Sequence, residues 1–450
     1  MDDDKALKWI AAMEARGLLF LAVVALIVGA ISGAICSAFR LSLEQADALR
    51  ARLLDFLNGT ASLGPFYGYS IPMTPLLAAM LMALAAASAA ALAAGLVRRV
   101  APAASGSGIP HVEAVVEGAM QPAPLALIPV KFCGGVLAMG GGLALGREGP
   151  SVQMGATVGH LLGGMLRMRW SDRRALIVGG AGAGLATAFN APVAGAVFVL
   201  EELLGRFDQR ISVVALGTSV GAIVVSRAIL SNELDFQVPE LAAGGLEAQG
   251  IFLLLGLFVG LLAYLYNRTL LTTLTLTERI GGPVEMRAAL IGAAVGLLAW
   301  YTPDLVGGGD NLTQLALSGE IALAFIPMLF LIRLLLSTFS YAAATPGGLF
   351  APMLVLGAVS GLAFGTLAVE RWPDLGVEAE AFAVVGMAAF FAGAVRAPVT
   401  GIVLVTEMTG SATLLLPLLA ACFGATLVVE MLREPPIYAS LRNRAAKFKR

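Results

Sequence analysis

One carboxylate stands alone in a glycine-rich, otherwise apolar part of the chain, and it is the first candidate for chemistry. Glu148 lies in a Gly-Arg-Glu-Gly-Pro segment that consists of Gly146, Arg147, Glu148, Gly149 and Pro150. An ionised side chain in apolar surroundings is costly, so it usually has a function such as proton transfer or gating. The structural alternative is an ion pair between Glu148 and Arg147. Adjacent residues at a helix start point in different directions, which favours the functional interpretation.

Two further segments repeat the arrangement of glycines followed by a proline. The first is Gly-Ser-Gly-Ile-Pro, formed by Gly106, Ser107, Gly108, Ile109 and Pro110, and the second is Gly-Gly-Leu-Phe-Ala-Pro at 347–352. Glycine allows a backbone turn, and proline suits the first turn of a helix. Free N–H groups and the positive end of the helix dipole make helix N-termini anion sites. Three converging N-termini therefore predict a small-anion site, to which Ser107 adds a hydroxyl donor.

Other kinds of site receive little support from the sequence. The chain has only two histidines, His111 and His160, and its three cysteines lie far apart, so no metal site is predicted. We expect no cofactor and no enzymatic activity, because no Ser/His pair, zinc pattern or Walker loop lies in a matching context. The glycine run from Gly179 to Gly184 resembles a dinucleotide loop but is interpreted as close helix packing.

The elements that position these segments are membrane helices. Of the 450 residues, 58% are apolar and only 13% are charged, which differs strongly from a soluble protein. Each long uncharged stretch has the length of a spanning helix: 17–39, 56–97, 175–200, 248–267, 334–369 and 408–429. The shorter runs 132–146, 211–226 and 382–395 predict helices that are tilted or end part-way, which requires protein or water to satisfy the freed backbone groups.

Charge is balanced, with a net charge of −1 and no long basic block, so nucleic acid is not an expected partner. A local basic excess lies in residues 436–450, and the positive-inside tendency predicts a cytoplasmic basic tail there. The N-terminus lacks the pattern of a cleaved signal peptide, so 17–39 is expected to be a retained membrane helix.

The sequence also contains an internal repeat. Residues 191–202 and 397–408 are identical at seven of twelve positions, at an offset of 206. We expect a first repeat at about 18–210 and a second at about 250–435, with a binding site between them. Glu201 matches Glu407 and is interpreted as a structural acid that caps or pairs within each half. Glu202 matches Met408, so only one half carries this extra carboxylate.

Together these motifs resemble the CLC family of chloride channels and chloride/proton exchangers, and Tyr438 in a Pro-Pro-Ile-Tyr segment adds a fourth mark in order. The resemblance spans nearly the whole chain and implies an all-α membrane protein of two inverted-topology repeats, built from tilted and broken helices. It implies an anion site formed by the Ser107 and Tyr438 hydroxyls and the backbone amides of Leu349 and Phe350. Without the family, Ser107 could equally be a helix cap, Tyr438 an interfacial anchor and Phe350 a core aromatic.

The resemblance further implies that Glu148 is the gating glutamate and transfers protons on the extracellular side. Glu202 matches the glutamate that relays protons on the intracellular side in the exchangers, with a surface charge as the alternative. Because Glu202 is present and Ser107 is retained, chloride/proton antiport is expected, and a passive voltage- or pH-gated chloride channel is the alternative. Proline at position 107 would instead have indicated nitrate, and fluoride-type relatives depart from these motifs. The resemblance also implies a homodimer, and we expect a bacterial inner membrane location and no nucleotide regulation.

Overall fold

The computed structural model describes residues 3–59 and 74–447, and over these ranges the chain is helical. The described residues contain no β-ladder, only two isolated backbone bridges. The α-helices are α1 (Asp3–Leu57), α2 (Pro75–Val100), α3 (Ile109–Val116), α4 (Leu127–Gly140), α5 (Glu148–Met165), α6 (Trp170–Phe189), α7 (Pro192–Phe198), α8 (Gln209–Leu230), α9 (Leu246–Ile280), α10 (Val284–Tyr301), α11 (Asp310–Leu317), α12 (Ile326–Ala342), α13 (Phe350–Arg371), α14 (Ala379–Val395), α15 (Pro398–Thr409), α16 (Leu415–Met431) and α17 (Ile437–Lys447).

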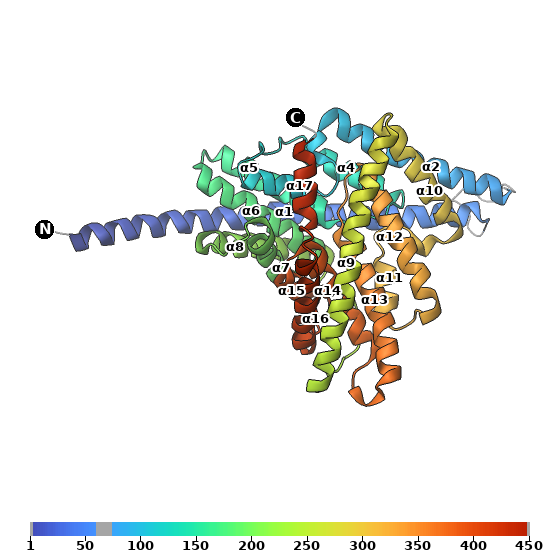
Figure 1. Ribbon diagram of the computed structural model, residues 1–450. Coiled ribbons are helices and arrows are strands. Elements are labelled where there is room, and N and C mark those ends of the chain that lie inside the picture. Colours follow the sequence, from blue (N-terminus) through green and yellow to red (C-terminus); the bar gives the residue numbers. More distant parts are fainter. Residues whose placement is uncertain (1–2, 60–73, 448–450) are drawn as a thin grey trace.

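Eight of the described helices are long and apolar enough to cross a membrane, and they are α1, α2, α8, α9, α10, α12, α13 and α16. Their directions differ widely: α1 crosses the view of Figure 1 from left to right, whereas α9 runs from top to bottom. The helices α4, α14 and α15 are apolar but shorter. The expected all-α membrane architecture of tilted and broken helices is therefore confirmed.

The helices occur in the same order in the two halves of the chain, with α1–α8 matching α9–α16. The contacts repeat as well, because α1 packs on α8 and α5 on α6, just as α9 packs on α16 and α13 on α14. Asn190 ends α6 and Arg396 ends α14, both with left-handed backbone (φ 48° and 67°), and they are separated by the offset of the sequence repeat. A left-handed residue is uncommon outside glycine, so its recurrence at matched positions supports the repeat.

Several predicted spans were wrong in detail. The uncharged stretch 175–200 contains two helices, α6 and α7, and 334–369 contains the end of α12 and most of α13. Each interruption between two helices contains a residue in the left-handed backbone conformation, Asn190 in the first and Ala344 (φ 57°) in the second. In contrast, the run 211–226 belongs to α8, which is a full-length spanning helix. Part of the stretch 56–97 lies outside the described residues.

The glycine run between Gly179 and Gly184 packs α6 against α5, as expected. A Cβ atom added to Gly180 would lie 2.2 Å from the Gly155 carbonyl oxygen, and one added to Gly184 would lie 2.1 Å from the Ser151 carbonyl oxygen. These distances are far below van der Waals contact, so only glycine permits this approach of the two backbones.

Two glutamates tie the halves together by capping each other's helices. Glu407, at the end of α15, accepts hydrogen bonds from the amides of Val193 (3.1 Å) and Ala194 (2.7 Å) at the start of α7. Glu201 accepts bonds from the amides of Val399 (3.1 Å) and Thr400 (2.7 Å) at the start of α15. The prediction of a structural capping acid is correct, but each cap acts on the opposite half.

The expected basic tail is also structured. Residues 437–447 form α17, and its first two residues are buried, with Ile437 and Tyr438 both 0% exposed. This helix packs on α3 and α14. The segment is therefore part of the helical fold, and its cytoplasmic location remains a prediction.

Removal of the Glu407 cap should destabilise the fold. We expect Glu407→Ala to cost about 1–2 kcal/mol, because two amides at the start of α7 lose a charged acceptor. The apparent melting temperature in detergent would report the loss. Glu247→Ala, at an exposed acid in the first turn of α9, is the matched control. Equal melting temperatures for the two variants would contradict the capping role.

Candidate anion-binding site

The three glycine-proline segments are held together by main-chain hydrogen bonds. The amide of Gly146 donates to the carbonyl of Gly348 (3.0 Å), and the amide of Gly348 donates back to Gly146 (2.7 Å). Gly106 donates to Thr345 (3.0 Å) and accepts from Gly347 (3.1 Å). Helices α3, α5 and α13 begin within three residues of these bonds. Pairing of the turns thus brings the three helix N-termini to one place between the repeats.

Glu148 lies at this point of convergence. Its side chain is 0% exposed, and its Oε1 atom accepts a hydrogen bond of 2.8 Å from the backbone amide of Phe350, the first residue of α13. Its Oε2 atom has no hydrogen-bond partner among the described residues. The carboxylate of one repeat therefore occupies the helix N-terminus of the other, which is a favourable position for negative charge.

Glycine is required around this carboxylate for reasons of space. A Cβ atom on Gly348 would lie 2.0 Å from Oε1 of Glu148, and one on Gly146 would lie 2.1 Å from Oε2. A Cβ atom on Gly149 would lie 2.6 Å from the Ser107 hydroxyl oxygen. The glycines of the motifs thus leave room for the groups expected to meet an anion.

Ser107 and Tyr438 supply two buried hydroxyls. Both side chains are 0% exposed, and neither hydroxyl oxygen has a hydrogen-bond partner among the described residues. Buried polar atoms nearly always have a partner, so these hydroxyls are available to a bound ion. The backbone amide of Ser107 is used internally, because it donates to the Tyr341 hydroxyl (3.3 Å). Sequence reasoning did not identify Tyr341.

The start of α13 serves both the site and the core. Leu349 is the N-cap residue of α13 and is 0% exposed. The Phe350 amide contacts Glu148, whereas the Phe350 ring packs against neighbouring rings. Its ring centroid lies 4.5 Å from that of Phe391 and 6.2 Å from that of Tyr438. The Phe350 ring is thus a core aromatic, its amide donates to a carboxylate, and its role in binding an anion stays a prediction.

A buried lysine near the site was missed in the sequence. Lys131 on α4 is 0% exposed, and its ammonium group donates to the carbonyls of Ala104 (3.0 Å) and Gly106 (2.7 Å). No acidic side chain of the described residues pairs with it. Lys131 therefore fixes the loop that presents Ser107. The sequence does mark Lys131 as unusual, since it is the single charged residue in the apolar stretch 118–146.

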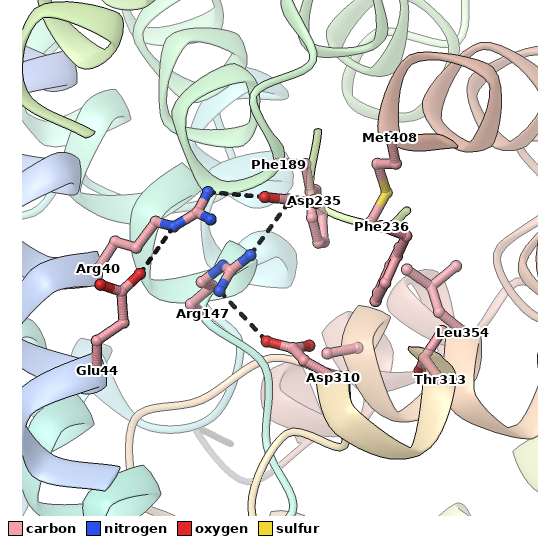
Figure 2. Close-up of a pocket in the computed structure, with 11 residues that line it drawn as sticks. Arg40, Glu44, Arg147, Phe189, Asp235, Phe236, Asp310, Thr313, Leu354 and Met408 are labelled. Atoms are coloured by element: carbon pink, nitrogen blue, oxygen red, sulfur yellow. Dashed lines mark hydrogen bonds and ion pairs between the residues drawn. The ribbon is translucent and has the colours of Figure 1, made fainter. Parts of the chain in front are cut away.

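Arg147 does not pair with Glu148. Its Nε atom donates to the carbonyl of Ala188 (2.8 Å), and its guanidinium forms ion pairs with Asp235 (3.1 Å) and Asp310 (3.4 Å). Figure 2 shows these residues around a cavity of about 160 Å³, which we call the gate vestibule. Its lining residues are Arg40, Glu44, Arg147, Phe189, Asp235, Phe236, Asp310, Thr313, Ala351, Leu354 and Met408.

A second acidic group lies at the far end of α3. Glu202 lies in the π-helical turn η2 (Val199–Leu203) and is partly exposed, and its carboxyl group is in hydrogen-bonding contact with that of Glu113 on α3. Two carboxyl groups in such contact repel one another when both are charged. Arg442 on α17 pairs with Glu117 (2.5 Å) and approaches Glu113 (3.7 Å). Sequence reasoning identified Glu202 but not Glu113.

Comparison with known proteins agrees with this architecture. Residues 89–430 match the family model described as voltage gated chloride channel. The chain is 40% identical over 359 residues to the H(+)/Cl(−) exchange transporter ClcA of Vibrio cholerae serotype O1, covering 78% of this chain and 77% of the relative. It is 36% identical over 434 residues to ClcA of Klebsiella pneumoniae, covering 95% of this chain and 88% of the relative.

Solved structures show the same fold. A slow cyanobacterial Cl⁻/H⁺ antiporter superposes with a TM-score of 0.89 at 33% identity, covering 96% of this chain and 99% of that structure. A CLC-type fluoride/proton antiporter gives a TM-score of 0.77 at 23% identity, covering 94% and 97%, which shows the fold alone. The chain belongs to the CLC family of voltage-gated chloride channels and exchange transporters.

Proposed function

We propose that this membrane protein is a chloride/proton antiporter, which moves chloride across the bilayer in exchange for protons. The relatives from Vibrio cholerae and Klebsiella pneumoniae are named H(+)/Cl(−) exchange transporters, and the cyanobacterial structure is described as a Cl⁻/H⁺ antiporter. The chain's own residues support the same activity, because its buried carboxylates and hydroxyls suit an anion and a proton and not an enzymatic reaction.

One contact carries this proposal, the hydrogen bond from the Phe350 amide to Glu148. A helix N-terminus favours an anion, and in this structure the anion is a tethered carboxylate. When Glu148 takes up a proton, its negative charge disappears and its attraction to the α13 N-terminus weakens. Chloride can then occupy the position that the carboxylate leaves. Proton uptake and chloride binding are thereby linked at one place.

Chloride would be held by neutral donors beside this gate. The hydroxyls of Ser107 and Tyr438 are the available side-chain donors, and the amides of Leu349 and Phe350 lie at the α13 N-terminus. The flanking glycines and Pro110 and Pro150 keep the helix starts in place. Neutral dipoles in a low dielectric bind an anion without holding it as tightly as a full positive charge would, which suits transport.

Protons would reach Glu148 from the opposite side through Glu202. The partial exposure of Glu202 gives it access to solvent, and its contact with Glu113 gives it a place to share the proton. Glu202 is therefore assigned as the intracellular proton-transfer residue, and Glu113 as the residue that positions it. In this arrangement α17 and its basic residues face the cytoplasm, and Glu148 faces the extracellular side.

The bacterial origin of the named relatives supports a location in the inner membrane. A homodimer with a separate pathway in each subunit is proposed from the family resemblance. The chain is proposed to need no cofactor, since chloride and protons are its substrates.

The second candidate function, a passive chloride channel, is favoured only by the description of the family model. Proton movement driven by a chloride gradient in liposomes distinguishes the two, because a channel moves chloride without it.

Neutralising Glu148 should uncouple proton movement from chloride movement. We expect Glu148→Gln to abolish chloride-driven proton movement and to retain chloride flux, since glutamine carries neither the charge nor the proton. Both fluxes are measured in liposomes, with a chloride electrode and a pH electrode. Proton coupling that survives in Glu148→Gln would contradict the role of Glu148.

Substitution of Glu202 or Glu113 should reduce proton flux and leave chloride flux unchanged. We expect Glu202→Gln to lose at least tenfold in proton flux at similar chloride flux, because the proton acceptor is removed far from the anion site. Glu113→Gln should reduce proton flux by a smaller factor, since it removes only the partner. Glu117→Gln, at the residue that follows the last turn of α3, is the matched control. Normal proton flux in Glu202→Gln would return Glu202 to a surface charge.

A further inference from the structure

A buried carboxylate holds two guanidinium groups together in the gate vestibule. The Asp235 side chain is only 3% exposed, and its two oxygens form ion pairs with Arg40 (2.8 Å) and Arg147 (3.1 Å). Figure 2 shows it between the two arginines, which come from α1 and from the start of α5. Sequence reasoning did not identify Asp235, which lies in the connection between α8 and α9.

This position is fixed from several sides. The next residue, Phe236, donates its amide to the carbonyl of Met408 (3.2 Å), which ties the connection to α15. Arg40 is held on α1 by Glu44 (3.2 Å), and Arg147 is held by the Ala188 carbonyl (2.8 Å). Asp235 thus joins the connection between the two repeats to the residue that directly precedes the gate.

The electrostatic consequence concerns Glu148. Arg147 precedes Glu148 in the chain, and its positive charge attracts the Glu148 carboxylate although they form no ion pair. A second guanidinium, on Arg40, lies on the same carboxylate of Asp235. Coulomb interactions decay slowly where little water screens them. Without Asp235, two positive groups in the vestibule would stabilise the charged form of the gate and make its protonation harder.

We propose that Asp235 is a positioning residue of the gate, which orients and neutralises Arg40 and Arg147 and thereby sets the pH range in which Glu148 opens. The proposal rests on the antiport function and on Glu148 as its gate. It gives the α8–α9 connection, which lies outside the anion-site motifs, a role in how Glu148 responds to pH.

Other charged groups around the vestibule are the same in each variant compared below, so they do not produce a difference between variants. They are Glu44, Asp47 and Arg50 on α1 and Asp310 on α11. Asp310 is 60% exposed in its side chain, so water screens it more than Asp235. The buried carboxylate is therefore the stronger influence on the two guanidinium groups.

The test measures chloride efflux from liposomes as a function of pH, set equal on both sides. Protonation of Glu148 frees the anion position, so efflux should rise as the pH falls. Asp235→Asn removes a negative charge, and the midpoint should move to lower pH by roughly one unit. Arg40→Gln removes a positive charge, and the midpoint should move in the opposite direction. A purely structural defect would not produce shifts of opposite sign.

The matched control is Glu233→Gln, which neutralises an exposed acid two residues away in the same connection and should leave the midpoint unchanged. In the double variant with Glu148→Gln, the Asp235→Asn shift should disappear, because the titrating gate is absent. An unchanged midpoint in Asp235→Asn, or a shift that persists in the double variant, would overturn the proposal. Absence of chloride-driven proton movement in the unmodified protein would instead refute the underlying antiport function, and coupling that survives in Glu148→Gln would refute Glu148 as its gate.

Discussion

The site depends on main-chain hydrogen bonds between glycine turns of the two repeats. In a membrane each backbone N–H and C=O group needs a partner within the protein, and turns at membrane depth are therefore the costly part of the fold. Gly146 and Gly348 satisfy one another, and Gly106 is satisfied by Thr345 and Gly347. Helices start directly after these turns. The same bonds therefore satisfy the backbone where the helices are interrupted and bring the free helix N-termini to one place.

The basic side chains near this point have partners other than Glu148, which leaves the carboxylate of the proposed gate without an ion-pair partner. Lys131 is satisfied by two backbone carbonyls, and Arg147 by Ala188, Asp235 and Asp310. Arg147 attracts the Glu148 carboxylate, and neither Lys131 nor Arg147 forms an ion pair with it. A direct pair would hold the carboxylate in its charged form, because breaking a buried pair is strongly unfavourable. Indirect attraction keeps it in place and still permits protonation.

Much of the fold could be predicted from the sequence, because composition, glycine-proline punctuation and the repeat are local or self-similar features. The N-termini at Ile109, Glu148 and Phe350 follow from the motifs directly. The breaks inside 175–200 and 334–369 could not be predicted from hydropathy, since residues on both sides are equally apolar. The partners Glu113 and Asp235 depend on contacts between distant segments, and no local pattern distinguishes them from surface acids.

The repeat sets the proposed gate, Glu148, apart from similar acids. Three glutamates reach from one half of the chain to a helix N-terminus of the other. Glu407 uses both oxygens on two amides, and Glu201 accepts two amides and the Thr400 hydroxyl. Glu148 binds α13 by Oε1, and its Oε2 has no partner among the described residues. A cap with both oxygens satisfied is a structural bond. Glu148 has one oxygen unsatisfied and lies among glycines that leave space, and this difference underlies the proposal that protonation releases it.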